Sequence, residues 1–142
     1  MNDLSPAFSR EQVNRQSALA LAHIGDGVYE LMVRTHIASG HEFSNEDMHR
    51  NTLRFVSASA QAKAFELIRE SLSEEEQAVF LRGRNAHSKS PKHTPPAEYH
   101  AATGLEALFG WLWLLGRRER LEELFDIILV DLPDGASKKS EE

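Results

Sequence analysis

Hydrophobic residues recur at helical spacing along nearly the whole chain, and no run alternates strictly between apolar and polar residues. This pattern predicts an all-α fold. A long first helix is expected over residues 17–39, ending at Gly40, because glycine tolerates the left-handed conformation of a helix stop. A second helical region, broken once, is expected over 44–72, since Ser44 and Asp47 resemble a capping box.

The second half of the chain continues the helical pattern around one interruption. A short helix is expected from Ser73 through Leu81, opened by another capping signature. Residues 83–96 combine glycine, serine, lysine and three of the five prolines, so they are expected to form a loop. Two further helices are expected at 97–115 and 118–132.

Length and composition bound the architecture. A chain of 142 residues with 41% hydrophobic content can bury one core. We therefore expect a single domain at 15–132, an N-terminal extension at 1–14 and a disordered tail at 133–142. No segment has the pattern of a secretion signal or a membrane span, which predicts a cytoplasmic protein. Because the chain lacks cysteine, any metal would bind to oxygen or imidazole.

The net charge of −6 argues against a protein that coats nucleic acid non-specifically. It conceals a basic segment, since no acidic residue lies between Glu76 and Glu98. His87 and His93 lie in this segment beside its cationic residues, which are Arg82, Arg84, Lys89 and Lys92. A local basic surface is therefore expected on an acidic protein.

Two carboxylates stand in helices that are otherwise apolar. Asp26 lies in the first helix, and Glu106 is the only charged residue in 101–116. An isolated ionised carboxylate in such surroundings is costly unless it is paired, protonated or bound to a cation. Two such acids favour one shared cation. The alternative, open at this point, is that each pairs with an arginine such as Arg34 or Arg54.

Helical spacing also predicts how these helices pack. In the first helix the expected core stripe lies opposite Asp26 and consists of Leu21, Ile24, Val28, Leu31 and Met32. A pair of glycines surrounds each carboxylate, namely Gly25 with Gly27 and Gly104 with Gly110. An interior glycine costs a helix roughly 1 kcal/mol relative to alanine. We therefore expect these glycines to allow a backbone contact that brings the carboxylates together.

These residues resemble the ribonuclease III family. Leu21–Glu30 reads LAHIGDGVYE and is similar to the signature helix of that family, whose core is Leu-Gly-Asp-Ala-Val. Ala102–Gly110 reads ATGLEALFG and is similar to the second catalytic motif, Phe-Glu-Ala-Leu-Ile-Gly. Two motifs in the right order are more specific than either alone. The resemblance implies the helical fold of the ribonuclease III endonuclease domain, assembled as a homodimer that packs signature helices together.

A further segment resembles the Mini-ribonuclease III branch, which has the catalytic domain without a double-stranded-RNA-binding domain. It comprises Arg82–Ala86, Pro91, Lys92 and Tyr99. The resemblance covers about residues 15–132. It implies an endoribonuclease that hydrolyses double-stranded RNA, with precursor ribosomal RNA as the expected target. It leaves open whether a ribosomal protein assists.

The resemblance assigns Asp26 and Glu106 as catalytic and metal-binding residues, with Mg²⁺ as the cofactor and Mn²⁺ as a substitute. Full-length relatives carry a glutamate where this chain has Ala22, and an aspartate where it has Thr103. A further family glutamate corresponds loosely to Gln61. These departures leave fewer carboxylates for a second metal ion.

Three further groups have expected roles. Glu30, one turn after Asp26, is a candidate outer-shell acceptor near the metal, or else an ion-pair partner of Arg34. The basic loop, alternatively only a solvated loop, is expected to bind the RNA duplex through Arg82, Arg84, Asn85, Lys89 and Lys92. Aromatic residues of the fourth helix are expected at the dimer interface, or else in the core, and they are Phe109, Trp111 and Trp113.

Two other functions stay open at this stage. Ala22 and Thr103 motivate a catalytically inactive ribonuclease III-like module that binds RNA or assists ribosome assembly. A helical metal-dependent phosphohydrolase would instead use histidines. The candidates are His23, His36, His41 and His49, but the chain has no His-Asp dipeptide and no paired histidines at a ligand spacing.

Overall fold

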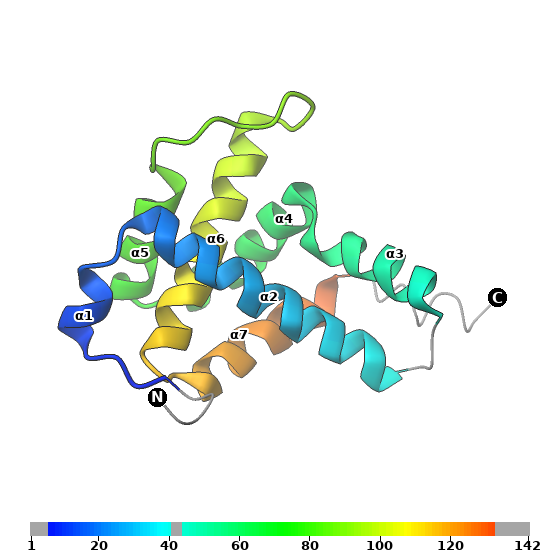
Figure 1. Ribbon diagram of the computed structural model, residues 1–142, viewed down its shortest axis with the longest axis horizontal. Helices are drawn as coiled ribbons and strands as arrows, with labels where there is room; N and C mark the ends of the chain where they lie inside the picture. The colour runs from blue at the N-terminus through cyan, green and yellow to red at the C-terminus, as the bar shows by residue number, and fades with distance from the viewer. Residues whose placement is uncertain (1–5, 41–43, 133–142) are drawn as a thin grey trace.

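The computed structural model of the protein describes residues 6–40 and 44–132 (Figure 1). In these ranges it contains helices and no strands, which confirms the all-α prediction. The elements in order are α1 (Arg10–Asn14), α2 (Ala18–Gly40), α3 (Asn45–Val56), α4 (Ala58–Ile68), the 3₁₀ turn η1 (Arg69–Ser71), α5 (Glu74–Arg84), α6 (Pro96–Leu114) and α7 (Arg118–Asp131). None of the described helices is long and apolar enough to cross a membrane.

Serine caps set the starts of the middle helices. The Ser44 hydroxyl accepts a hydrogen bond from the backbone N–H of Asp47 at 3.2 Å, and Ser73 forms a full capping box with Glu76. Ser57 has extended backbone angles, φ −62° and ψ 154°, so it ends α3, and its hydroxyl caps α4. The single break expected in the second helical region therefore lies at Ser57.

α6 is the centre of the domain, with α2, α4 and α5 packed around it (Figure 1). Its large side chains with no exposed surface are Leu105, Leu108, Phe109, Trp111 and Leu112. Burying one such side chain contributes about 1.5–3 kcal/mol relative to leaving it exposed. Neighbours on several sides explain why α6 is apolar nearly all round.

Glycines let α2 and α6 approach until their backbones touch. A Cβ atom at Gly25 would overlap the Glu106 carbonyl oxygen and lie 2.8 Å from the Gly110 nitrogen, and one at Gly110 would overlap a backbone oxygen of α2. The expected backbone contact is thus present at two of the four glycines. Gly27 instead faces open space, and Gly104 packs against α5.

α5 extends farther than predicted. It spans Glu74–Arg84, so Gly83 lies in a helix rather than in the loop expected at 83–96. A Cβ atom at Gly83 would come 2.7 Å from the Cβ of Ala107. Here glycine permits helix–helix contact and does not end the helix, and the connection to α6 is confined to residues 85–95.

The buried face of α2 differs from the expected stripe. Ile24 and Leu31 are 38% and 64% exposed, although helical spacing placed both in the core. The residues that α2 does bury are Leu21, Ala22, Gly25, Tyr29, Val33 and Ile37. Because α2 is apolar nearly all round, its periodicity could not select the buried side. The contact with α6 through Gly25 selects it.

The segment expected to be an extension packs against the domain. α1 was not expected from the sequence, and its Val13 side chain is fully buried. The N–H of Phe8 donates to the Leu114 carbonyl oxygen at 3.0 Å. The domain limits of 15–132 stay a prediction, and the expected tail at 133–142 lies outside the described residues.

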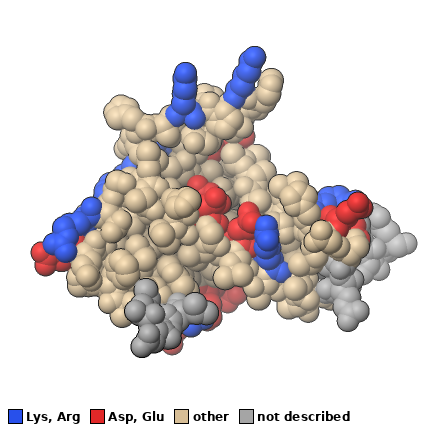
Figure 2. Space-filling view, viewed as in Figure 1, with Lys and Arg blue, Asp and Glu red and all other residues tan. Residues whose placement is uncertain are grey.

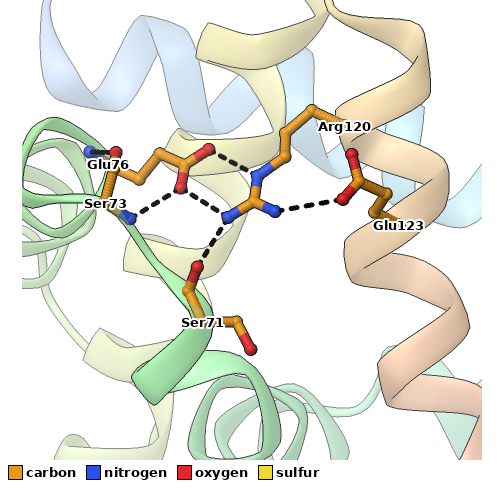
Figure 3. A network of polar contacts seen from close by, with 5 residues as sticks. All are labelled: Ser71, Ser73, Glu76, Arg120 and Glu123. Carbon is orange, nitrogen blue, oxygen red and sulfur yellow. Dashed lines mark hydrogen bonds and ion pairs between the residues drawn. The ribbon is translucent and has the colours of Figure 1, made fainter.

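A largely buried ion pair attaches α7 to the start of α5 (Figure 3). The Arg120 guanidinium donates to both carboxylate oxygens of Glu76, at 2.9 and 2.8 Å, and to the Ser71 carbonyl oxygen at 2.7 Å. Burial acts to raise the pKa of Glu76, but hydrogen bonds from Arg120 and Ser73 hold it below its ordinary value. The two parallel hydrogen bonds fix the orientation of α7.

Candidate active site

Asp26 and Glu106 come together where α2 crosses α6. The contact between Gly25 and the Glu106 carbonyl places the residues next to Gly25 against the middle of α6. Asp26 is near enough for its charge to raise the pKa of Glu106. Asp26 is exposed and Glu106 is partly buried. The pair is therefore open to solvent on the α2 side and backed by the core on the α6 side.

The environment of Glu106 disfavours a second negative charge. Burial, the charge of Asp26 and the hydrogen bond to Asp26 together raise the pKa of Glu106 to about 8, against the opposing effect of a hydrogen bond from Gln61. Two carboxylates in contact cannot both be ionised at low cost. At neutral pH the pair therefore favours either a shared proton or a bound cation.

Gln61 of α4 is the third member of the site. Its side chain is buried, and its Nε2 donates to the Oε2 atom of Glu106 at 3.4 Å. The amide lies 45 positions away in sequence, and it is the position that corresponds loosely to a family glutamate. A neutral amide here orients Glu106 without adding charge.

The donors fit a hard divalent cation that keeps part of its water shell. Among the described residues, no three His, Cys, Asp or Glu side chains gather closely enough to hold a metal. Ala22 is buried and offers no ligand, and the buried Thr103 hydroxyl donates to the Tyr99 carbonyl oxygen at 3.0 Å. Two carboxylates with water are the ligand set that Mg²⁺ accepts in proteins.

The structure does not contain the arginine pairs that were the alternative for Asp26 and Glu106. Arg34 pairs with Glu30, four residues earlier on α2, rather than with Asp26. Arg54 lines a separate groove of about 950 Å³ between α4, α5 and α6. Within residues 6–40 and 44–132, neither Asp26 nor Glu106 forms an ion pair.

Glu30 lies on the same helix one turn beyond Asp26. Its carboxylate accepts a hydrogen bond from the Arg34 guanidinium. This ion pair was the expected alternative to an outer-shell role near the metal. The structure therefore supplies an observed partner for Glu30, and contact with a metal-bound water stays a prediction.

Tyr29 is a neighbour of the site that sequence reasoning did not select. Its ring is fully buried and makes edge contacts with Phe109 and Phe125, with centroids 5.2 and 6.0 Å away. The hydroxyl has no hydrogen-bond partner among the described residues, and burial, followed by the charge of Glu106, raises its pKa. The available signal was an aromatic residue three positions after Asp26 in the signature helix.

The residues expected to bind RNA divide between α5 and the loop. Arg82 and Arg84 lie on α5, and the Arg82 guanidinium donates to the Gln16 carbonyl oxygen at 3.1 Å, a contact inside the chain. Asn85 ends α5, and Lys89 and Lys92 are exposed in the loop. Figure 2 shows basic side chains projecting from the edge where this loop lies, with acidic side chains near the centre of the face.

The aromatic residues expected at a dimer interface are mostly in the core. Phe109 and Trp111 have no exposed surface within the single chain, which favours the core alternative, and their interface role stays a prediction. The Trp111 Nε1 atom donates a hydrogen bond to the Asn14 Oδ1 atom at 3.5 Å, so the polar atom of the indole has its partner within the chain. Trp113 is partly exposed, with the Arg118 guanidinium 6.0 Å from its ring centre.

The histidines do not form a metal site in the described part of the chain. His23 and His49 are exposed on α2 and α3. His36 packs edge-on against Phe55 and Phe125, with ring centroids 6.1 and 6.3 Å apart. His41 lies outside the described residues. The described histidines therefore do not support the phosphohydrolase alternative.

Comparison with known proteins agrees with the geometry. Residues 19–117 match the family model described as the ribonuclease III domain. A Mini-ribonuclease 3 of Clostridium tetani is 39% identical over 132 residues, which cover 89% of this chain and 85% of that protein. A Mini-ribonuclease 3 of Symbiobacterium thermophilum is 46% identical over 107 residues, which cover 75% and 82% respectively.

The fold is also found in a solved structure. A crystal structure of a Fusobacterium nucleatum protein matches with a TM-score of 0.77 at 27% identity, covering 83% of this chain and 98% of that one. This match supports the helical fold. The family model and the curated relatives confirm the resemblance drawn from the two motifs. The chain belongs to the ribonuclease III family, and the curated relatives that it resembles are Mini-ribonuclease 3 proteins.

Proposed function

We propose that this protein is a divalent-metal-dependent endoribonuclease that hydrolyses double-stranded RNA. The observation that supports it is the meeting of Asp26 and Glu106 at the backbone contact between α2 and α6. Two carboxylates from separate helices, with Glu106 biased toward a proton or a cation, form a site for a phosphodiester reaction rather than a structural ion pair.

Each site residue has a role in this proposal. Asp26 and Glu106 hold Mg²⁺, for which Mn²⁺ substitutes, and Gln61 fixes the rotamer of Glu106 through its hydrogen bond. The bound ion supplies Lewis-acid activation of the scissile phosphate and of the water that attacks it. Asp26 is the exposed member, so it faces the substrate side.

The basic residues at the end of α5 and in the loop supply contacts to the duplex. Arg84, Asn85, Lys89 and Lys92 are exposed, whereas Arg82 contributes charge while its guanidinium also bonds within the chain. Side chains recognise duplex RNA mostly through its shape, its phosphates and its 2′-hydroxyls. A basic segment on the same domain as the carboxylate pair fits that substrate.

We further propose that the enzyme acts as a homodimer that packs α2 against α2. Ile24 and Leu31 expose apolar surface on the side of α2 away from α6, and the Gly27 position faces open space. A second copy of the same helix would cover this face and give one carboxylate pair for each strand of the duplex. This surface is exposed in the single chain, whereas Phe109 and Trp111 are buried.

Cleavage of a labelled RNA duplex with Mg²⁺ tests the proposal. The wild-type chain should cut the duplex, and Asp26→Asn and Glu106→Gln should each lower the rate by at least about a hundredfold. Glu122→Gln, an exposed change on α7, is the matched control. A correctly folded wild-type chain that binds the duplex without cutting it would instead support the inactive RNA-binding module that Ala22 and Thr103 motivate.

The natural target is proposed to lie in precursor ribosomal RNA. This part rests on family resemblance, and a ribosomal-protein helper is proposed on the same basis only. The target is tested by sequencing RNA ends in cells depleted of the protein. The control is the same depletion complemented with the Asp26→Asn variant. Ends that change only in other transcripts would exclude ribosomal RNA.

A further inference from the structure

A groove of about 950 Å³ lies between α4, α5 and the first turns of α6, and we call it the α4–α5 groove. Two alanines of α6, Ala97 and Ala101, line it. At 3.6 residues per turn they point about 180° and 140° away from Glu106 around the helix axis, whereas Gly110, which touches α2, points about 40° away. The α4–α5 groove therefore lies on the other side of α6 from the carboxylate pair.

The floor of the α4–α5 groove is apolar. The rings of Phe65 and Phe80 stack there with centroids 3.5 Å apart, and Leu81 beside them is 41% exposed. Small side chains leave the space next to this floor open, and they belong to Ser59, Ala62, Ala97 and Ala101. A concave site with an apolar floor is suited to receive apolar side chains of a ligand.

The charge around this floor is positive. Among the described residues that line the groove, the cations are Arg54, Lys63, Arg69 and Arg84, and the acids are Glu66 and Glu98. Glu66 pairs with Arg69 at 3.2 Å, so this acid is already neutralised. Arg54 and Lys63 are exposed and form no ion pair with any described residue. These two cations are available to carboxylates of a bound segment.

This combination fits a helical segment of a partner protein. Such a segment docks by placing apolar side chains at helical spacing into a groove, and carboxylates beside them pair with cations on the rim. A duplex presents phosphates and 2′-hydroxyls, which gain nothing from contact with an apolar floor of Phe65 and Leu81. The described ranges contain no strand, so an extended peptide has no sheet edge to join there.

We propose that the α4–α5 groove binds an acidic amphipathic helix of a partner protein. The helix places its apolar side chains against Phe65 and Leu81, and its carboxylates pair with Arg54 and Lys63. The partner is defined by this chemistry, namely apolar residues at helical spacing flanked by Asp or Glu. The inference goes beyond the proposed nuclease function and does not depend on it.

Selection from a displayed library of helical peptides tests which chemistry the groove accepts. The wild-type chain should enrich peptides that carry leucine or phenylalanine at helical spacing with Asp or Glu between them. Enrichment of basic peptides, or of no peptide, would overturn the proposal. The most enriched peptide, labelled with fluorescein, is the probe whose affinity is then measured by anisotropy.

Two exposed substitutions in the groove should weaken binding of this peptide. Lys63→Glu and Leu81→Asp should each raise its Kd by about tenfold or more, because each replaces a favourable contact by a repulsive or polar one. Lys92→Glu and Leu53→Asp are the matched controls, since both residues are exposed outside the groove, and they should change the Kd by no more than about twofold. Circular dichroism establishes that each variant is folded. Equal losses in the groove and control variants would overturn the proposal.

Cleavage of duplex RNA by the same variants separates this inference from the nuclease proposal. Lys63→Glu and Leu81→Asp should cut the duplex at the wild-type rate, and the duplex should not displace the labelled peptide. Displacement of the peptide by RNA would assign the groove to nucleic acid and overturn the proposal. A wild-type chain that binds the peptide but cuts no duplex would refute the nuclease and keep this surface.

Occupants supplied by the chain itself are distinguished in two further measurements. Leu132 lines the groove, so a synthetic peptide of residues 133–142 is tested as a competitor, and it should bind more weakly than the selected peptide. Tighter binding would make this chain the occupant. Self-association of the wild type that Lys63→Glu abolishes would make a second copy the occupant. Either result would overturn the proposal.

Discussion

The carbonyl oxygen of Glu106 occupies the space that a Cβ atom on residue 25 would need, so only glycine fits at that position. The residue whose side chain completes the carboxylate pair thus also supplies the backbone contact that sets the pair. Any change that separates α2 from α6 would move Asp26 away from Glu106. Stability and activity are therefore coupled at this crossing.

Gly25→Ala should be strongly destabilising because its methyl group would overlap the backbone of α6. We expect the free energy of unfolding to fall by about 3 kcal/mol or more, in the range of severe steric defects. Urea denaturation measures it. Gly27→Ala is the matched control, since its Cβ meets nothing within 4 Å, and it should be neutral or stabilise the chain by up to about 1 kcal/mol. Equal effects of the two changes would contradict the crossing.

Glu106→Gln should change the pH dependence of stability in the absence of metal. Burial, with the charge of Asp26, raises the Glu106 pKa from 4.5 to about 8 in the folded chain, so the folded state keeps this proton while the unfolded state loses it. The wild type should therefore lose stability as pH rises from 4.5 to 8, and the variant should lose less. Thermal melting in EDTA measures this.

The melting temperature of Glu106→Gln should exceed that of the wild type at pH 8 and approach it near pH 4.5. Adding Mg²⁺ at pH 8 should raise the melting temperature of the wild type and have little effect on Glu106→Gln or Asp26→Asn, since ligand binding stabilises the folded state. A stability difference that is constant with pH would show that Glu106 does not retain its proton.

Glu76→Gln should weaken the attachment of α7 to the start of α5, because it removes the charge that pairs with Arg120. Breaking a buried pair costs about 3–5 kcal/mol, and we expect about 2 kcal/mol here because the Arg120 side chain is 25% exposed. Glu123→Gln, whose side chain is 65% exposed, should cost far less. Chemical denaturation compares the two.

The same pair predicts a defined acid sensitivity. Burial acts to raise the Glu76 pKa, yet the hydrogen bonds from Arg120 and Ser73 hold the folded-state value below the ordinary 4.5. Its stabilising contribution is thus present above pH 4.5 and is lost as pH falls through the lowered value. The stability gap between wild type and Glu76→Gln should close in that acidic range. A gap that persists there would exclude this origin.

Leu31→Glu should disrupt the proposed homodimer without unfolding the chain, since Leu31 is 64% exposed in the single subunit. Size-exclusion chromatography with light scattering should give a dimer for the wild type and a monomer for the variant. Val130→Glu is the control, because Val130 is 81% exposed at the end of α7 and lies outside the proposed interface. A dimer that survives Leu31→Glu would place the interface elsewhere.

Local sequence features determined the elements and the candidate carboxylates. Serine caps at Ser44 and Ser73 act within one helical turn, so helix starts could be predicted from neighbouring residues. Asp26 and Glu106 were recognisable because each is a charge in an apolar helix, and the family motifs identified them independently. These signals need no knowledge of which helices pack together.

Tertiary packing decided what helical periodicity could not. α2 and α6 are apolar nearly all round, so the exposure of Leu31 and the burial of Phe109 depend on which neighbours cover each side. The approach of Gln61 to Glu106 joins positions 45 residues apart, which no local pattern encodes. A single sequence specifies which residues are apolar or charged, whereas the close contact at Gly25 decides which of their faces meet.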